Sequence, residues 1–198
     1  MTTTQNDAHS VAQAVHDLGS ALWFGGSAMG VIGVNSSGRD LKDGADRIRV
    51  ASSAWGRFAP AQWAGIGATL LAGLQLTRVG GRRIALQKGF GTVGATKAGL
   101  AVAGAAATAY AAYCGKKIAE ATAEAERRGE PIDVVDATTP TEQTPETVAK
   151  WQRQQRVAQF IGPVLAGANI AAGSHLVQSY RTGATVEGVL GRLLPNRR

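Results

Sequence analysis

Three histidines are the residues of this chain whose type is best suited to chemistry. His16 lies just before one apolar stretch, His175 lies inside another, and His9 follows a polar start. An imidazole in an apolar helix can ligate haem or copper, or relay protons, when a second ligand is near. It can equally donate a hydrogen bond to a neighbouring helix or stay hydrated near the surface. Haem or metal binding by His16 and His175 is therefore one hypothesis, and a protein without a cofactor or metal is the favoured one.

Two further features contain residue types that occur in reactive sites, but the surrounding sequence lacks the partners that such sites need. Cys114 is the only cysteine, which excludes an internal disulfide, a cysteine-based zinc site and a CxxC redox pair. Residues Gly89 to Gly94 read G-F-G-T-V-G, but no βαβ unit surrounds them and no acidic residue follows at the usual distance. We interpret Cys114 as a packing residue and the glycines as a loop before a helix. No catalytic residue is predicted, and we expect that the protein is not an enzyme.

The elements that position these residues are indicated by where charges are absent. Only 18% of the 198 residues are charged. A soluble helical bundle carries charged residues on the outer face of each helix, at a period of 3.6. Four stretches of 18 to 24 residues have no charge on any face, and each has about the length that a helix needs to cross a bilayer. These stretches are 18–38, 58–77, 98–115 and 157–180.

The fold class that follows is all-α, an integral membrane four-helix bundle with one extended helix and a water-exposed loop. We expect a single domain over residues 1–198, in the plasma membrane, as a multi-pass protein. The mean hydropathy of −0.05 is low for such a protein. A soluble bundle rich in alanine and glycine is therefore the alternative. The predicted spans are residues 16–36, 58–78, 94–115 and 156–180.

Small residues explain how helices of such low hydropathy could associate. The chain has 36 alanines and 26 glycines. In a membrane, helices pack where small residues at a spacing of four let them approach closely, although this composition also produces such pairs by chance. The glycines predicted to pack are Gly26, Gly30, Gly104, Gly162 and Gly167. Amides inside the apolar stretches are expected to bond across helices, and they are Gln62, Gln75, Gln159 and Asn169.

Charged and aromatic residues between the apolar stretches indicate contact with a membrane surface. Residues 39–57 predict a short interfacial helix, and aromatic rings beside cations are typical of the headgroup level. The predicted anchors are Trp55, Arg57, Trp63 and Trp151. The net charge is +7, but the cations are spread over four connecting regions without a nucleic-acid signature. We therefore expect anionic lipid headgroups as partners, and no nucleic acid.

Residues 116–156 are predicted to be the part exposed to water. The third helix continues past its apolar stretch, and residues 129–144 read as an exposed, mobile linker rich in proline, threonine and acids. A membrane protein partner could dock on this region, or it could be an idle solvated loop. Protease cleavage between Gly129 and Thr144 is the expectation.

Orientation is indicated by the distribution of cations. The first lysine or arginine is Arg39, so no secretory signal is expected before the first apolar stretch. The connections after the first and third helices carry twelve cations against nine for the other side. This favours both termini outside the cell, although the basic connection at 78–88 argues for the reverse.

Two short motifs carry a resemblance to a known group. Residues His16 to Gly26, with a histidine followed later by the pattern Trp-x-Gly-Gly at residues 23–26, resemble the first segment of small bacterial four-helix membrane proteins, including copper-resistance-D-like membrane domains. Residues 54–58 resemble the second segment of that group. The resemblance implies four transmembrane helices and carries over no catalytic residue, and the few histidines and methionines depart from copper handling. The predicted function is a non-catalytic scaffold or small accessory subunit of a membrane complex.

Overall fold

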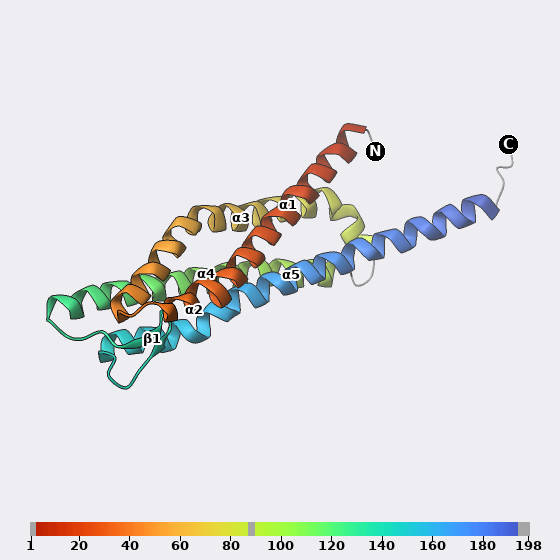
Figure 1. The fold of residues 1–198 in the computed structure, drawn as a ribbon. Helices are drawn as coiled ribbons and strands as arrows, with labels where there is room; N and C mark the ends of the chain where they lie inside the picture. The colour runs from red at the N-terminus through yellow and green to blue at the C-terminus, as the bar shows by residue number, and fades with distance from the viewer. Residues whose placement is uncertain (1–2, 87–89, 194–198) are drawn as a thin grey trace.

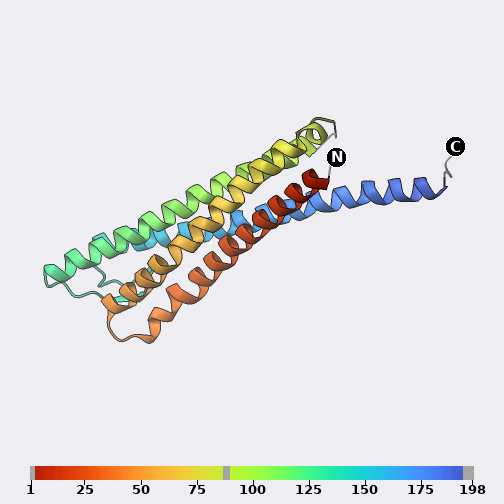
Figure 2. The same cartoon turned by 90° about the horizontal axis from the view of Figure 1, so that it is seen from above.

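Four long helices, which run in alternating directions, form a bundle. The computed structural model describes the backbone of residues 3–86 and 90–193, and the side chains of residues 9–78 and 92–175. Figures 1 and 2 show the helices packed along their length, with the end of α5 extending past the other three. The all-helical prediction is confirmed. The helices are α1 (Thr3–Met29), α3 (Gly44–Leu86), α4 (Phe90–Arg127) and α5 (Glu146–Leu193).

The turn between α1 and α3 is built from three short helical pieces. A π-helical turn, η1 (Gly30–Val34), continues α1 and is followed by α2 (Asn35–Ser37) and a 3₁₀ turn, η2 (Gly38–Asp40). A π turn holds one more residue than an α turn, which changes the direction of the side chains that follow it. Its effect here is to place Asn35 inside the bundle, where it is 3% exposed.

The prediction of a separate interfacial helix at residues 39–57 was wrong. From Gly44 onward these residues belong to α3, which runs for 43 residues without a break. The side chain of Asp43 accepts a hydrogen bond from the backbone N–H of Asp46 (2.9 Å), which caps the start of this helix. Pro60 lies inside α3. Proline removes a backbone donor and crowds the preceding turn, and α3 bends away from α4 over its first half in Figure 1.

The extended helix that the sequence predicts is α4, which continues twelve residues beyond the end of its charge-free stretch, to Arg127. Gly129 then adopts a φ of 72°, a left-handed conformation that glycine tolerates. The N–H of Glu130 donates to the carbonyl of Ala125 (3.0 Å), which closes the helix in a Schellman turn.

The connection between α4 and α5 is folded, so the prediction of an exposed, mobile linker was wrong for its middle part. Strands β1 (Val134–Asp136) and β2 (Thr139–Pro140) pair as an antiparallel hairpin. Val134 is fully buried in a core with Ile48, Ile118 and Val148. The guanidinium of Arg47 donates to the carbonyl of Val134. Protease cleavage between Gly129 and Thr144 is no longer expected at the buried residues 134 and 136–138. We call residues 35–57 and 116–156, which carry the hairpin, the cap.

All five glycines predicted to pack lie against a side chain of another helix. A methyl group added to Gly104 would lie 2.8 Å from the ring of Trp23, and one added to Gly162 would lie 2.7 Å from the hydroxyl of Thr108. These distances are too short for real atoms, so the helices approach closely because these residues are glycine. The other three contacts are Gly26 with Phe58, Gly30 with Trp55, and Gly167 with Phe24.

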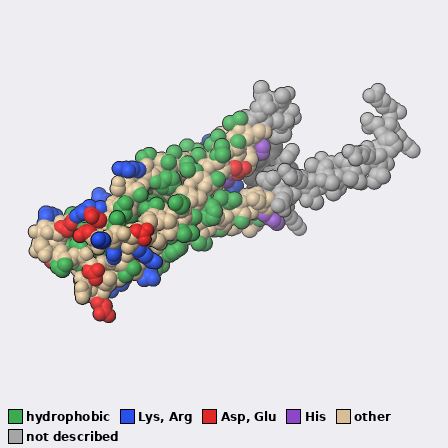
Figure 3. Space-filling model, viewed as in Figure 1, with side chains coloured by type: hydrophobic (Ala, Val, Ile, Leu, Met, Phe, Trp, Pro, Cys, Tyr) green, Lys and Arg blue, Asp and Glu red, His purple; other side chains and the backbone are tan. Residues whose placement is uncertain are grey.

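The surface of the bundle divides into a charged end and an apolar middle. Figure 3 shows acidic and basic side chains over the cap and hydrophobic side chains over the helices beside it. Among the described residues, two helical segments, Thr92–Arg127 and Glu146–His175, are long and apolar enough to cross a membrane. The prediction of four such helices is supported by composition for α4 and α5.

Substitution of Gly104 is expected to separate helices that now touch. Gly104→Ala should lower the free energy of unfolding by about 1–3 kcal/mol, because the buried Trp23 cannot move aside. Gly99→Ala is the matched control on the same helix, since no described atom lies within 4 Å of its added methyl group. Thermal unfolding followed by circular dichroism compares the two. Equal midpoints for both variants would contradict close packing at Gly104.

Candidate functional site

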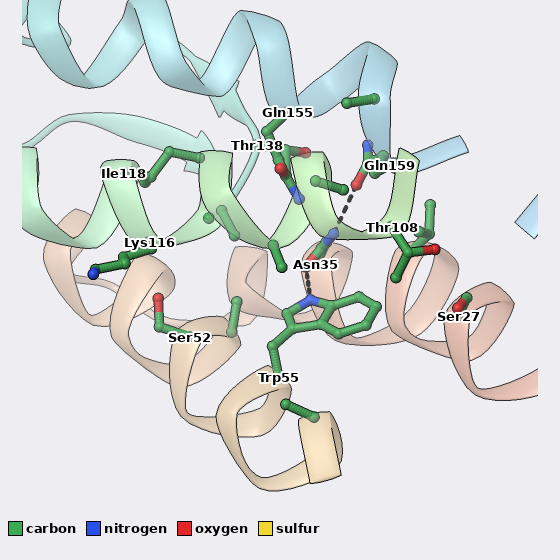
Figure 4. A pocket seen from close by; sticks show the side chains of 18 of the residues that line it. Ser27, Asn35, Ser52, Trp55, Thr108, Lys116, Ile118, Thr138, Gln155 and Gln159 are labelled. Atoms are coloured by element: carbon green, nitrogen blue, oxygen red, sulfur yellow. Dashed lines mark hydrogen bonds between the residues drawn. The ribbon is translucent and has the colours of Figure 1, made fainter. Parts of the chain in front are cut away.

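A cavity of about 300 Å³ lies between the four helices at the level where they meet the cap. All four helices contribute to its walls, and Ala137 and Thr138 of the hairpin also line it. In Figure 4, Thr138 lies at the upper end of the cavity. Most of the lining is small or apolar, and the larger apolar side chains are Val31, Ile48, Trp55, Trp63 and Ile118. A pocket of this size and character can take a small, mostly apolar molecule.

One wall of the cavity is a chain of hydrogen bonds through Asn35. The indole Nε1 of Trp55 donates to Oδ1 of Asn35, and Nδ2 of Asn35 donates to Oε1 of Gln159, both at 2.7 Å (Figure 4). Gln159 in turn donates to the carbonyl of Arg156 (3.3 Å). Asn35 thus links the end of α1 to α3 and to α5. This role of Asn35 could not be predicted from the sequence, because the π turn that orients it has no signal in composition or spacing.

A second set of hydrogen bonds lies deeper in the bundle. Nε2 of Gln62 donates to the hydroxyl of Ser27 (2.8 Å), and Nε1 of Trp23 donates to the hydroxyl of Thr108 (3.2 Å). The hydroxyl of Thr108 donates to the carbonyl of Gly104 (2.9 Å), so this group is satisfied in both directions. Polar side chains inside the bundle therefore hold helices together, as expected for Gln62 and Gln159.

Three buried amides, those of Asn169, Gln155 and Gln152, have a side-chain polar atom without a hydrogen-bond partner among the described residues. Asn169 is 0% exposed, and neither of its side-chain polar atoms has a hydrogen-bond partner among the described residues. Gln155 is 8% exposed, and its Oε1 accepts no hydrogen bond from any of them. Gln155 lines the cavity and points into it in Figure 4, whereas Asn169 does not line it. Gln75, the fourth amide predicted to bond across helices, is exposed instead.

The cavity reaches the surface between α3 and α4. Of its lining residues, Gly56 and Trp63 on α3 and Ala112 and Lys116 on α4 are exposed. A methyl group added to Gly56 or Gly115 would have no described atom within 4 Å. The two helices are therefore separated here, in contrast to the close contacts at the packing glycines. This mouth opens sideways, toward whatever surrounds the bundle.

The histidines lie outside this cavity. His16 is 3% exposed, lies against Gly73 of α3, and has its Nδ1 3.2 Å from the carboxylate of Asp17. His175 lies on α5, two residues beyond Gly173. Within residues 9–78 and 92–175, no group of three or more histidine, cysteine or acidic side chains could share a metal ion. Cys114 is fully buried and is not among the cavity residues.

The predicted interface anchors take different positions. The indole of Trp55 points into the bundle toward Asn35, and its role as a headgroup anchor stays a prediction. Trp151 packs edge-on against Tyr113 (5.6 Å between ring centroids) at the core of the cap. Trp63 and Arg57 are exposed at the surface of α3. Of the glycine motif, Gly89 lies outside the described residues, and Phe90 to Gly94 form the start of α4.

Asp136 holds the hairpin of the cap to the rest of the molecule. Both Nε and Nη2 of Arg39 donate to its Oδ2 (3.0 and 2.7 Å), and the N–H of Thr138 donates to its Oδ1 (2.9 Å). Burial acts to raise the pKa of Asp136, but these hydrogen bonds favour the ionised form and leave the pKa below its ordinary value. The carboxylate is therefore charged at neutral pH and its charge is compensated.

Comparison with models of protein families, with curated proteins and with solved structures finds no match to this chain. The resemblance to copper-resistance-D-like domains is neither supported nor contradicted by it.

Asp136→Asn is expected to loosen the hairpin. The variant keeps the shape but loses the charge, so amide hydrogen exchange over residues 133–141 should accelerate about tenfold at neutral pH. Because the pKa is depressed in the folded protein, this stabilisation is present above the unfolded value of about 4 and is lost as pH falls below it. Wild type and variant should therefore converge at acid pH.

Glu142→Gln is the control, because Glu142 is an exposed carboxylate of the same segment. Its exchange rates should match those of wild type at every pH. If Asp136→Asn exchanged no faster than this control, the link through Arg39 would not hold the hairpin.

Proposed function

We propose that this protein is a non-catalytic integral membrane protein that crosses the plasma membrane four times and serves as a scaffold or small accessory subunit. The observation that carries this proposal is the reversed distribution of polarity in the bundle. Large apolar side chains lie on its outside and polar side chains lie inside it. Both parts of that distribution fit lipid as the surrounding medium.

The outer surface of the charge-free stretches is apolar on every helix. Leu18, Ile32, Leu71 and Val102 are 62–73% exposed. Left in water, each such side chain costs about 1–2 kcal/mol, whereas lipid solvates it. Further exposed apolar residues of the same stretches are Leu22, Phe24, Met29, Trp63, Leu74, Tyr110, Tyr113, Val157, Phe160, Ile161 and Val164. We call this set, with the four above, the apolar belt.

The interior of the bundle contains more polar side chains than the core of a soluble protein usually does. Ser20 and Thr69 lie within hydrogen-bond distance (3.2 Å) across α1 and α3, in addition to the bonds of Gln62, Asn35 and Trp23. In lipid there is no water to hydrate such groups, so they turn inward and pair. Four spans, and not two, are favoured because α1 and α3 contribute to the apolar belt at the same level as α4 and α5.

The cap supports the role of a subunit that meets a partner. It is a folded surface held by buried residues and by ion pairs between elements, such as Arg49 with Glu126 and Arg39 with Asp136. A surface that is ordered in advance loses less conformational freedom when a partner binds. The connections after the first and third helices, on the cap side of the bundle, carry twelve of the 21 lysines and arginines. This distribution favours a cytoplasmic cap beside anionic headgroups, with both termini outside.

Membrane insertion is tested by extraction. The apolar belt predicts that the protein stays in the membrane pellet after washing in alkaline carbonate and enters solution only with detergent. Release by carbonate alone would identify a soluble or peripheral bundle and overturn the proposal.

The orientation is tested by labelling cysteines introduced in a Cys114→Ala background. In intact cells, a membrane-impermeant maleimide should label Thr4→Cys and should label Glu142→Cys, at the exposed tip of the cap, only after permeabilisation. The opposite pattern would place the cap outside the cell, and labelling of both before permeabilisation would contradict a cap separated from the N-terminus by the membrane.

A further inference from the structure

The cavity between α3 and α4 has properties that none of the roles above uses. It has a volume of about 300 Å³, and its mouth opens sideways at the border between the apolar belt and the cap. Because the bundle crosses the membrane in the proposed function, on which this inference rests, that mouth faces lipid near the headgroups. A molecule could then enter from the bilayer without passing through water.

We propose that this cavity binds a monoacyl glycerophospholipid, with the acyl chain inside and the phosphate at the mouth. The lower half of the cavity, away from the cap, is formed by small and apolar residues, among them Ala59, Ala111 and Pro163. Its polar groups at that depth, Gln62, Ser27 and Thr108, are bonded to one another or to Trp23 and Gly104. This half therefore offers an apolar surface to a chain, and its volume suits one chain better than two.

Gln155 supplies the recognition of a hydroxyl group. Its side-chain amide points into the cavity (Figure 4), and its buried Oε1 accepts no hydrogen bond from a described residue. A buried acceptor without a donor is unfavourable, and a ligand O–H would satisfy it. Gln155 lies beside Thr138 of the hairpin (Figure 4), on the cap side of the cavity, so the hydroxyl would lie on the headgroup side of the chain.

Lys116 supplies the recognition of a phosphate. It is the first charged residue after the charge-free stretch of α4, its side chain is 72% exposed, and it lies at the mouth. Its Nζ is 3.7 Å from Glu120, whereas Lys117 holds the same carboxylate at 2.7 Å. Lys117 therefore compensates much of the charge of Glu120 and leaves Lys116 able to pair with an anion outside the cavity.

The order of these groups selects the class of ligand. From the depth of the cavity outward, the protein offers an apolar channel, then a hydrogen-bond acceptor, then a cation. A monoacyl glycerophospholipid presents an acyl chain, then a free hydroxyl, then a phosphate. A diacyl lipid lacks the free hydroxyl and has a second chain that the cavity does not hold.

The test uses the full protein in vesicles of diacyl phosphatidylcholine, with a monoacyl phosphatidylglycerol whose chain carries bromine as the probe. Bromine quenches nearby tryptophans, and Trp55 and Trp63 both line the cavity. Quenching of the wild type should saturate with added probe. The same lipid with the one free hydroxyl of its acylated glycerol methylated should bind about tenfold more weakly, because Gln155 would gain no donor between the chain and the phosphate.

Variants separate the cavity from the surrounding bilayer. Gly115→Leu fills the open space at the mouth and should abolish the saturable quenching. Gly99→Leu is the matched control, because Gly99 is a glycine of the same helix with equal open space that does not line the cavity. If Gly115→Leu does not fold, as judged by circular dichroism, Ala112→Leu blocks the same mouth.

Two further variants test the polar contacts. Gln155→Leu should weaken binding about tenfold and erase the difference between the free and methylated probes. Lys116→Gln should weaken binding about threefold, because an exposed pair is partly screened. Lys150→Gln is the control, since Lys150 is an exposed lysine of the cap that does not line the cavity, and it should leave binding unchanged.

The outcomes distinguish this proposal from the one on which it rests. Protein that does not float with the vesicles overturns membrane insertion. Protein that floats but shows only the non-saturable quenching of Gly115→Leu overturns the lipid site and leaves insertion intact. Equal binding of the two probes to wild type, or equal affinity of a diacyl probe, overturns the assignment of the ligand class.

Discussion

The amide of Asn35 joins three helices at the level where the charged cap meets the apolar part of the bundle. It accepts from Trp55 of α3 and donates to Gln159 of α5, while its backbone continues α1. A single side chain can make both bonds only because the π turn before it directs it inward. In a low-dielectric interior each of these hydrogen bonds is strong, and a buried polar group left without its partner destabilises the fold. The positions of α1, α3 and α5 around the cavity therefore depend on this one amide.

The same constraint explains why the cavity and the cap lie next to each other. Trp55 is held by Asn35 at one wall, and beside it Gly56 of α3 and Gly115 of α4 border open space. Farther from the cap, where glycines such as Gly104 meet large side chains, the helices close and the space disappears. On the other side, Ile48, Ile118, Val134 and Val148 form the core of the cap, and Ile48 and Ile118 also line the cavity. Buried polar bonding, helix spacing and the folded hairpin are thus parts of one arrangement.

The sequence predicted correctly those features that depend on the composition of one continuous stretch of residues. The charge-free stretches predicted the helices and the apolar belt, because composition alone sets how a side chain interacts with its surroundings. It was misleading for residues 129–144, whose polar composition indicates a loop. Their order comes from Arg39, Arg47 and Gln152, which reach the hairpin from distant parts of the chain. The role of Asn35 depends on a π turn, and spacing rules for regular helices do not include one.

Glycines show why the candidate site could not be read from the sequence. Gly104 and Gly115 lie on one helix eleven residues apart, in stretches of similar composition. One is a glycine because Trp23 leaves no room for a side chain, and the other borders open space. A spacing of four identifies neither role, since what matters is the size of the side chain on the facing helix. Small residues therefore bring the helices together at one level of this bundle and leave a lateral opening at another. The directions in which the side chains of Trp23 and Trp55 point decide which of the two occurs at each level.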